Sequence, residues 1–198
     1  EVVKIQVSTD KNTASLDLNV LWKSAKYENG KAYIEENTSI VVHQLKTGIR
    51  MIDFEISLQA LVPGVSLGGS DDEKGYGGLC TRIKTPDDLV FTSTDGPVTP
   101  DRLHVIAGPW MDFSGSFGKG ESQNGLAILC HPGTPNYPAP WILRQKASMQ
   151  NIVFPGRDPV EISMDHPNRL RYRLILHAGN ADEVDLALLQ SEYSNTKF

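Results

Sequence analysis

The sequence lacks the features that define most familiar functional classes. No apolar run approaches the roughly 18 to 20 residues needed to span a bilayer, so no membrane contact is expected. There is no nucleotide-binding glycine fingerprint, no phosphate loop, no Gly-x-Ser-x-Gly and no His-Glu-x-x-His. These absences exclude the standard motif-bearing nucleotide-dependent enzymes, hydrolases and zinc proteases, and we expect no cofactor.

Clusters of charge and of metal-binding residues are also missing. Lys and Arg number 19 against 24 Asp and Glu, and the charges are interspersed, so nucleic acid is not the expected partner. Cys80 and Cys130 lie too far apart for a Cys-x-x-Cys pair, and we expect two separate buried thiols rather than a disulfide. The five histidines show no metal-ligand spacing, so the sequence predicts no metal site.

Length and composition describe an ordinary soluble globular chain. Its 198 residues suffice for one sizeable core but not for two comfortable domains, so we expect a single domain over residues 1–198. The chain begins at Glu1 and not at Met, so we expect it to be the C-terminal part of a longer protein or to have lost a leader. Both a periplasmic and a cytoplasmic location stay open.

The hydrophobic pattern has the period of β-strands. Apolar and polar residues alternate over 14–22 and, without a single error, over 52–60, while Asn29-Gly30 is a strong hairpin signal between these segments. The sequence therefore predicts an all-β fold, an antiparallel two-sheet β-sandwich. Its expected core residues are Leu16, Leu18, Phe54, Ile56, Leu58, Leu126, Ile128, Leu170 and Leu174.

The last third of the chain contains one strand with a basic face and one helix. Over 168–177, Arg169, Arg171, Arg173 and His177 share the face opposite to the leucines. Asn180 is a typical helix cap before an acidic first turn, so we expect a helix over 181–193.

The most informative stretch runs from Trp110 to Trp141. Residues 126–130 are all apolar and predict a core strand that brings His131 to its edge. The following loop contains four prolines in nine residues, which fix its shape because each one restricts φ and removes a backbone donor. Rigid loops at the ends of strands often carry binding sites, so we place the candidate site between His131 and Trp141.

The candidate catalytic residues are His131 and Asp112. An imidazole at the mouth of a core strand can transfer protons near neutral pH, and Asp112 is a candidate for the carboxylate that tunes it. Each residue also has a purely structural interpretation: His131 as a cap on a strand-end carbonyl, and Asp112 as an acceptor at a turn or strand end.

The candidate binding residues are arginines and aromatic residues. Arg82, Arg171 and Arg173 can hold a polyhydroxylated or anionic ligand through forked donors, or else form ion pairs on a solvated strand face. Trp110, Tyr137 and Trp141 can provide flat platforms for sugar rings, or else pack in the core and the loop. Asn136 and His177 complete the predicted binding set.

Several blocks of residues, in one order along most of the chain, resemble a bacterial family of uncharacterised proteins that carries the label PmoA-like. These blocks are Tyr76-Gly77-Gly78-Leu79-x-x-Arg82, Trp110-x-Asp112-Phe113-Ser114-Gly115, Gly125-Leu126-Ala127-Ile128-x-x-His131-Pro132, Asn136-x-Pro138-x-Pro140-Trp141 and Leu170-Arg171-Tyr172-Arg173-Leu174-x-x-His177-x-Gly179. The methane monooxygenase subunit behind the label is a membrane protein, whereas this chain has no segment able to span a bilayer.

The resemblance implies a galactose mutarotase-like β-sandwich and an association with bacterial sugar metabolism, but no particular activity. The Pro-x-His-His stretch that usually precedes this region in the family is absent from the sequence. Two hypotheses follow for a small-molecule carbohydrate ligand. The chain is either a carbohydrate-processing enzyme that uses His131 and Asp112, or a non-catalytic carbohydrate-binding or assembly module that uses the same loop.

Overall fold

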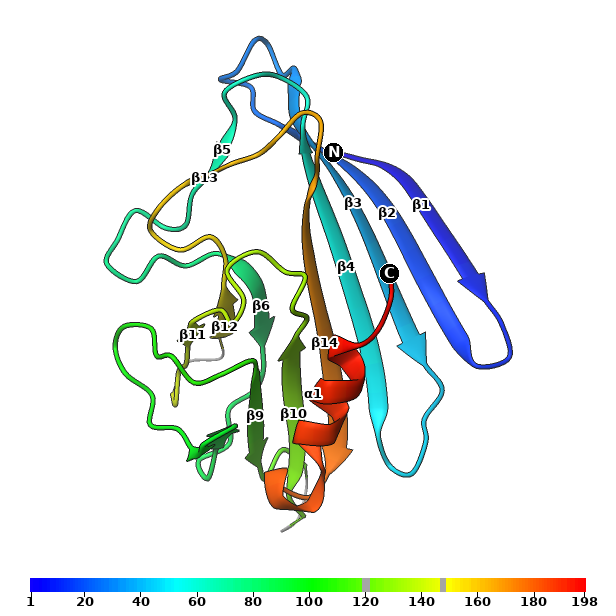
Figure 1. Cartoon of the computed structure of the whole chain (residues 1–198), viewed down its shortest axis with the longest axis vertical. Helices are drawn as coiled ribbons and strands as arrows, with labels where there is room; N and C mark the ends of the chain where they lie inside the picture. Colours follow the sequence, from blue (N-terminus) through cyan, green and yellow to red (C-terminus); the bar gives the residue numbers. More distant parts are fainter. Residues whose placement is uncertain (119–121, 147–148) are drawn as a thin grey trace.

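The computed structural model describes residues 1–118, 122–146 and 149–198, and its largest element is a nine-stranded antiparallel sheet (Figure 1). The strand order is β1-β2-β3-β4-β14-β10-β9-β7-β8. The bounds are β1 Val2–Thr9, β2 Thr13–Lys23, β3 Ala32–His43, β4 Arg50–Ala60, β7 Val90–Ser93, β8 Gly96–Pro97, β9 Trp110–Gly115, β10 Asn124–Cys130 and β14 Asn168–Ala178. The first four strands form an antiparallel meander, and β14 joins them to the later strands.

Two smaller antiparallel ladders accompany the large sheet. One has the order β11-β12-β6 and the other pairs β13 with β5. Their bounds are β5 Ser66–Leu67, β6 Gly78–Arg82, β11 Trp141–Ile142, β12 Met149–Val153 and β13 Val160–Glu161. The prediction of an all-β fold with one C-terminal helix is confirmed.

The core lies between the three-stranded ladder and the later half of the large sheet. Phe113, Ile128 and Tyr172 from the large sheet share one cluster with Trp141 of β11 and Ile152 of β12, all of them almost fully buried. The opposite face of the same strands forms a second cluster with the C-terminal helix. Strands β9, β10 and β14 are therefore covered on both faces, which explains the continuous apolar run of β10.

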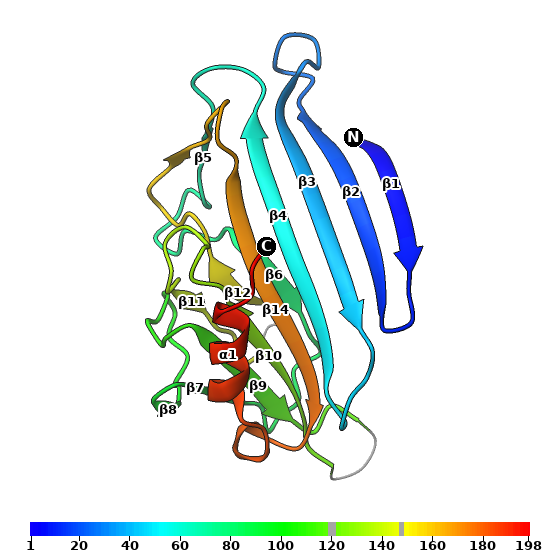
Figure 2. The same cartoon turned by 45° about the vertical axis from the view of Figure 1, so that its right-hand side comes forward.

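The strands β1 to β3 extend beyond the covered region, as Figures 1 and 2 show. Ile5 and Val7 on β1 are 64% and 68% exposed, and Leu16 and Leu18 on β2 are only half-buried. The prediction that Leu16 and Leu18 belong to the core is therefore wrong. Their alternation marks the apolar face correctly, but the main buried cluster includes Ile34 of β3 and Leu58 and Ala60 of β4 and not these two residues of β2.

The C-terminal helix is shorter than predicted and begins later. A single 3₁₀ turn, η1 Ala181–Glu183, is capped by Asn180, and the α-helix α1 Leu186–Ser194 has its own cap at Asp185. The predicted capping by Asn180 is correct, but Asp185 accepts a hydrogen bond from the backbone N–H of Leu188 and starts a new helix. No helix in the described ranges is both long enough and apolar enough to cross a bilayer.

Because the sheet is covered unevenly, substitutions in it should lower the free energy of unfolding by different amounts. Phe113→Ala should lower the free energy of unfolding by about 3 to 5 kcal/mol, because it empties a site in the fully buried cluster. Leu16→Ala, on the half-covered strand β2, should cost clearly less. Urea unfolding of both variants measures the difference, and equal losses would contradict this description of the core.

Candidate functional site

The predicted site residues of the large sheet lie on the face that α1 covers. Asp112 on β9 and Arg171, Arg173 and His177 on β14 share this face, and His131 follows directly after β10. The structure divides them into two groups. Asp112 and His177 lie at one end of β14, and His131 lies beside Arg171 near the other.

The first group is a buried chain of three polar side chains. His177 Nε2 lies 2.8 Å from Asp112 Oδ1, and the Ser114 hydroxyl donates to Asp112 Oδ2. His177 Nδ1 lies 3.1 Å from the Ala178 carbonyl oxygen, which can only accept. Both ring nitrogens thus face acceptors, so this environment favours the doubly protonated imidazolium. The side chains of Asp112 and His177 are 0% exposed, and they form a buried ion pair.

A glycine makes room for this ion pair. Gly125 on β10 pairs with His177 on one side and with Ser114 on the other. A Cβ at residue 125 would lie 2.2 Å from the His177 ring, a distance that real Cβ atoms do not adopt. Gly125 therefore lets the imidazole cross β10 and reach the carboxylate on β9.

This pairing corrects the predicted partnership of His131 with Asp112. The carboxylate bonds to His177, and the order of contacts is Ser114, Asp112, His177. Nucleophilic catalysis by serine requires the imidazole to touch the hydroxyl, with the carboxylate behind it. Here the carboxylate stands in the middle, so the group holds Ser114 in place and does not activate it.

The second group surrounds His131, which is 9% exposed. Its Nδ1 accepts a hydrogen bond of 2.9 Å from the Gly133 backbone N–H, while its buried Nε2 has no hydrogen-bond partner among the described residues. The rings of Tyr193 and Phe198 meet it edge to face, with centroids 5.4 and 5.1 Å away. Burial lowers the pKa of His131, and the Arg171 guanidinium lowers it further.

The basic face of β14 is neutralised by acidic residues of β4. Arg173 holds Asp53 with two hydrogen bonds of 2.6 and 2.9 Å, and Arg171 donates to Glu55 over 2.9 Å. The register places each arginine directly opposite its carboxylate. The interpretation as ion pairs within a strand face is therefore confirmed for these two arginines.

Aromatic residues of the C-terminal segment cover the same two arginines. The guanidinium carbon of Arg171 lies 4.6 Å from the ring centroid of Phe198, and that of Arg173 lies 4.6 Å from the ring centroid of Tyr193. These are cation–π contacts. One signal in the sequence indicates the ion pairs: Asp53 and Glu55 alternate with apolar residues over 52–60, on strand β4.

The other predicted binding residues hold the structure together. Trp141 is fully buried and donates its Nε1–H to the Gly108 carbonyl over 3.0 Å, and Trp110 is almost fully buried beneath α1. Asn136 has a positive φ of 62° and donates to the Val153 carbonyl. Neither tryptophan presents an open ring face to solvent in this structure. Arg82 lies on β6, in the three-stranded ladder, and is exposed.

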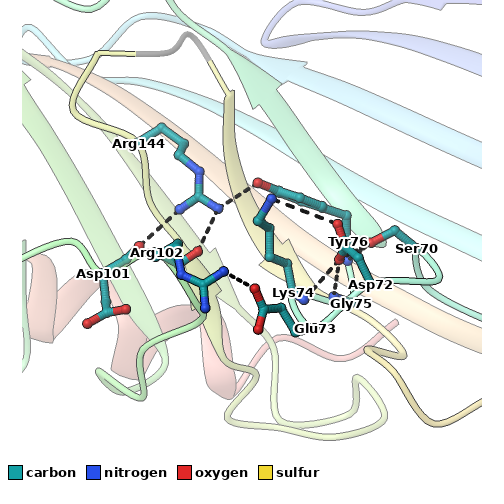
Figure 3. Close-up of polar contacts among 9 residues, drawn as sticks. All are labelled: Ser70, Asp72, Glu73, Lys74, Gly75, Tyr76, Asp101, Arg102 and Arg144. Atoms are coloured by element: carbon teal, nitrogen blue, oxygen red, sulfur yellow. Dashed lines mark hydrogen bonds and ion pairs between the residues drawn. The ribbon is translucent and has the colours of Figure 1, made fainter.

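A second polar network, which the sequence did not reveal, fixes the loop before β6 (Figure 3). Arg144 donates to the Tyr76 hydroxyl over 2.6 Å and to the carbonyl oxygens of Asp101 and Arg102, and Arg102 pairs with Glu73. The acceptors of the Arg144 guanidinium are thus supplied by the protein itself. Arg144 therefore joins two loops. The sequence did not reveal this network, because its contacts connect segments that are distant along the chain.

The described ranges contain no group of three or more His, Cys, Asp or Glu side chains placed to hold a metal ion. Cys80 is exposed and Cys130 is buried, and both are free thiols, as expected, although only Cys130 is in the interior. Burial raises the pKa of Cys130 to about 12, so this thiol stays protonated and unreactive near neutral pH.

The buried ion pair predicts a pH dependence of stability. Burial alone would lower the pKa of His177, but the hydrogen bonds to Asp112 and Ala178 and the charge of Asp112 outweigh it, so the pKa is raised. The unfolded chain binds this proton with a pKa of about 6.5, so the stabilisation is complete below about pH 6.5. It is lost as the pH rises through the folded-state pKa.

The measurement is the free energy of unfolding of the unmodified protein and of His177→Gln from about pH 6.5 to the alkaline limit of the folded state. The advantage of the unmodified protein should shrink as the pH rises through this window. His166→Gln, at an exposed histidine, is the matched control and should leave the pH profile unchanged. A difference between protein and His177→Gln that stays constant over the window would refute the raised pKa.

Comparison with known proteins gives a family but no function. No curated protein and no solved structure matches the chain. A family profile, described as a family of unknown function (DUF6807), matches residues 2–190, which extend from β1 into α1. The chain therefore belongs to the family of unknown function DUF6807.

Proposed function

We propose that the chain is a carbohydrate-binding protein and that the sugar lies on the polar face of the large sheet, beside the C-terminal segment. The observation that carries this proposal is a shallow pocket of about 350 Å³ across β2, β3, β4 and β14. All of its lining side chains except that of Leu18 are polar: Asp17, Asn37, Thr38, Ser39, Glu55, Ser57 and Arg169.

The chemistry of this pocket suits hydroxyl groups. Arg169 pairs with Glu55 over 3.2 Å, so donor and acceptor stand next to each other with little net charge. A sugar hydroxyl both donates and accepts, and it can bridge such a pair. Asp17 adds a further acceptor from β2, and the hydroxyls of Ser39 and Ser57 serve in either role.

An aromatic ring lies next to this polar surface. Glu55, which lines the pocket, also binds Arg171, and Arg171 lies over the ring of Phe198. Phe198 is 51% exposed. Carbohydrate sites commonly combine hydrogen-bonding side chains with one apolar ring face, and Phe198 is the residue that offers one here.

The predicted loop from His131 to Trp141 reaches the same face. Thr134 Oγ accepts from the Arg171 backbone N–H over 3.0 Å and also donates to the Arg171 carbonyl. The loop therefore contacts β14 at the arginine that joins Glu55 to Phe198. The resemblance to the PmoA-like family, with its association with sugar metabolism, supports the same class of ligand.

A catalytic role is the second candidate, and one observation favours it. The Nε2 of His131 is buried without a hydrogen-bond partner among the described residues, so the fold leaves its hydrogen-bonding capacity unused. General acid–base catalysis also needs a proton acceptor or donor in reach, and Glu55 is engaged with Arg171. If the chain is an enzyme, His131→Gln should abolish turnover while sugar affinity is retained.

Calorimetric titration with a panel of neutral sugars and sugar acids tests the binding proposal. Arg169→Ala should weaken binding by about tenfold or more, because it removes a charged donor, and should leave the melting temperature nearly unchanged. Arg157→Ala, at an exposed arginine outside the pocket, is the matched control. Equal loss in both variants, or no binding by any sugar, would rule out this site for the ligands tested.

A further inference from the structure

A second pocket lies at the other end of the helix-covered face and shares no residue with the polar sheet surface. It has a volume of about 350 Å³ and is enclosed by β7, β8, β9 and the turn that opens η1. Five polar side chains line it: Thr92, Ser114, Gln123, Asn180 and Asp182. This size lies at the lower end of the range for small-molecule sites.

The floor of this pocket is Ser114, which is only 4% exposed. Its hydroxyl proton is donated to Asp112, so only the oxygen lone pairs of Ser114 are left for a ligand. Asp112 is itself fixed by His177. The buried ion pair thus holds Ser114 as an acceptor of defined direction, and a ligand must present a donor to it.

The walls add further hydrogen-bonding groups. The side-chain Oδ1 of Asn180 accepts from the Asp182 backbone N–H over 2.9 Å, which leaves the side-chain NH₂ of Asn180 as a donor. Within the described ranges, the side chains of Thr92 and Gln123 make no hydrogen bond to the protein. Several polar groups that face one enclosed space are therefore available to a ligand.

The charge of the lining selects among ligands. Asp182 is the one ionisable side chain among the residues that line the pocket, and Glu183 and Asp185 follow it in the chain. The charges of Asp112 and His177, which lie behind Ser114, compensate each other. No lining residue is a lysine or an arginine, so a negatively charged ligand would be repelled.

We propose that this pocket binds a molecule of monosaccharide size that presents hydroxyl or ammonium donors and carries no negative charge. The proposal is independent of the sugar site on the polar sheet face. The Ser114 acceptor and the Asp182 carboxylate receive the donors of the ligand, and the Asn180 amide donates to one of its hydroxyls.

Three probes with a common ring and different charge test this proposal: D-glucosamine, D-glucose and D-glucuronate. Titrations followed by NMR should move the side-chain amide signals of Gln123 and Asn180. Affinity should be in the millimolar range expected for so small a ligand. Glucosamine should bind several-fold more tightly than glucose, and glucuronate should bind most weakly.

Three variants separate this site from the other one. Asp182→Asn should remove the preference for glucosamine over glucose. Thr92→Val should weaken the binding of both sugars without changing the buried ion pair. Arg169→Ala, in the sugar site proposed above, should leave the Gln123 and Asn180 responses unchanged. The proposal is overturned if the Gln123 and Asn180 signals do not move with glucosamine, or if glucuronate binds as tightly as glucosamine. It is also overturned if Arg169→Ala abolishes the shifts of these signals.

Discussion

The structure depends above all on the pairing of β14 with β4 on one side and with β10 on the other. This strand comes near the end of the chain and joins the N-terminal meander to the strands of the covered core. Its inner residues, such as Leu170 and Tyr172, belong to the main cluster, and its outer residues meet the helix and the acidic side of β4. A shift of its register by one residue would exchange the two faces and bury the arginines in the core.

The same register creates the electrostatic pattern of the outer face. Arg171 and Arg173 lie opposite Glu55 and Asp53, so a face that is basic in sequence is close to neutral in the fold. Tyr193 and Phe198 then cover the guanidinium groups and shield these pairs from water. This compensation supports the proposed polyhydroxylated ligand over a strongly anionic one, because the arginines already have carboxylate partners.

The buried pair of Asp112 and His177 is costly to form, because both charges are removed from water. Its geometry is closely determined: Gly125 opens the path, the Ala178 carbonyl fixes the second ring nitrogen, and Ser114 satisfies the other carboxylate oxygen. A network satisfied in this way is rigid, and it holds the Ser114 oxygen at the floor of a polar pocket.

The local structure of this chain follows from patterns along its sequence. The period-two pattern predicted the long strands, the apolar run 126–130 predicted β10, and Asn180 predicted a cap, because each depends on neighbours along the chain. Which side chains contact each other depends instead on the three-dimensional fold. The fold pairs Asp112 with His177 and not with His131, and it neutralises the arginines with residues more than a hundred positions away. It also buries Trp110 and Trp141 and leaves Leu16 and Leu18 half-covered. The physical reason is that strand order and the extent of the covering layer arise from long-range pairing, which alternation along a single strand does not encode.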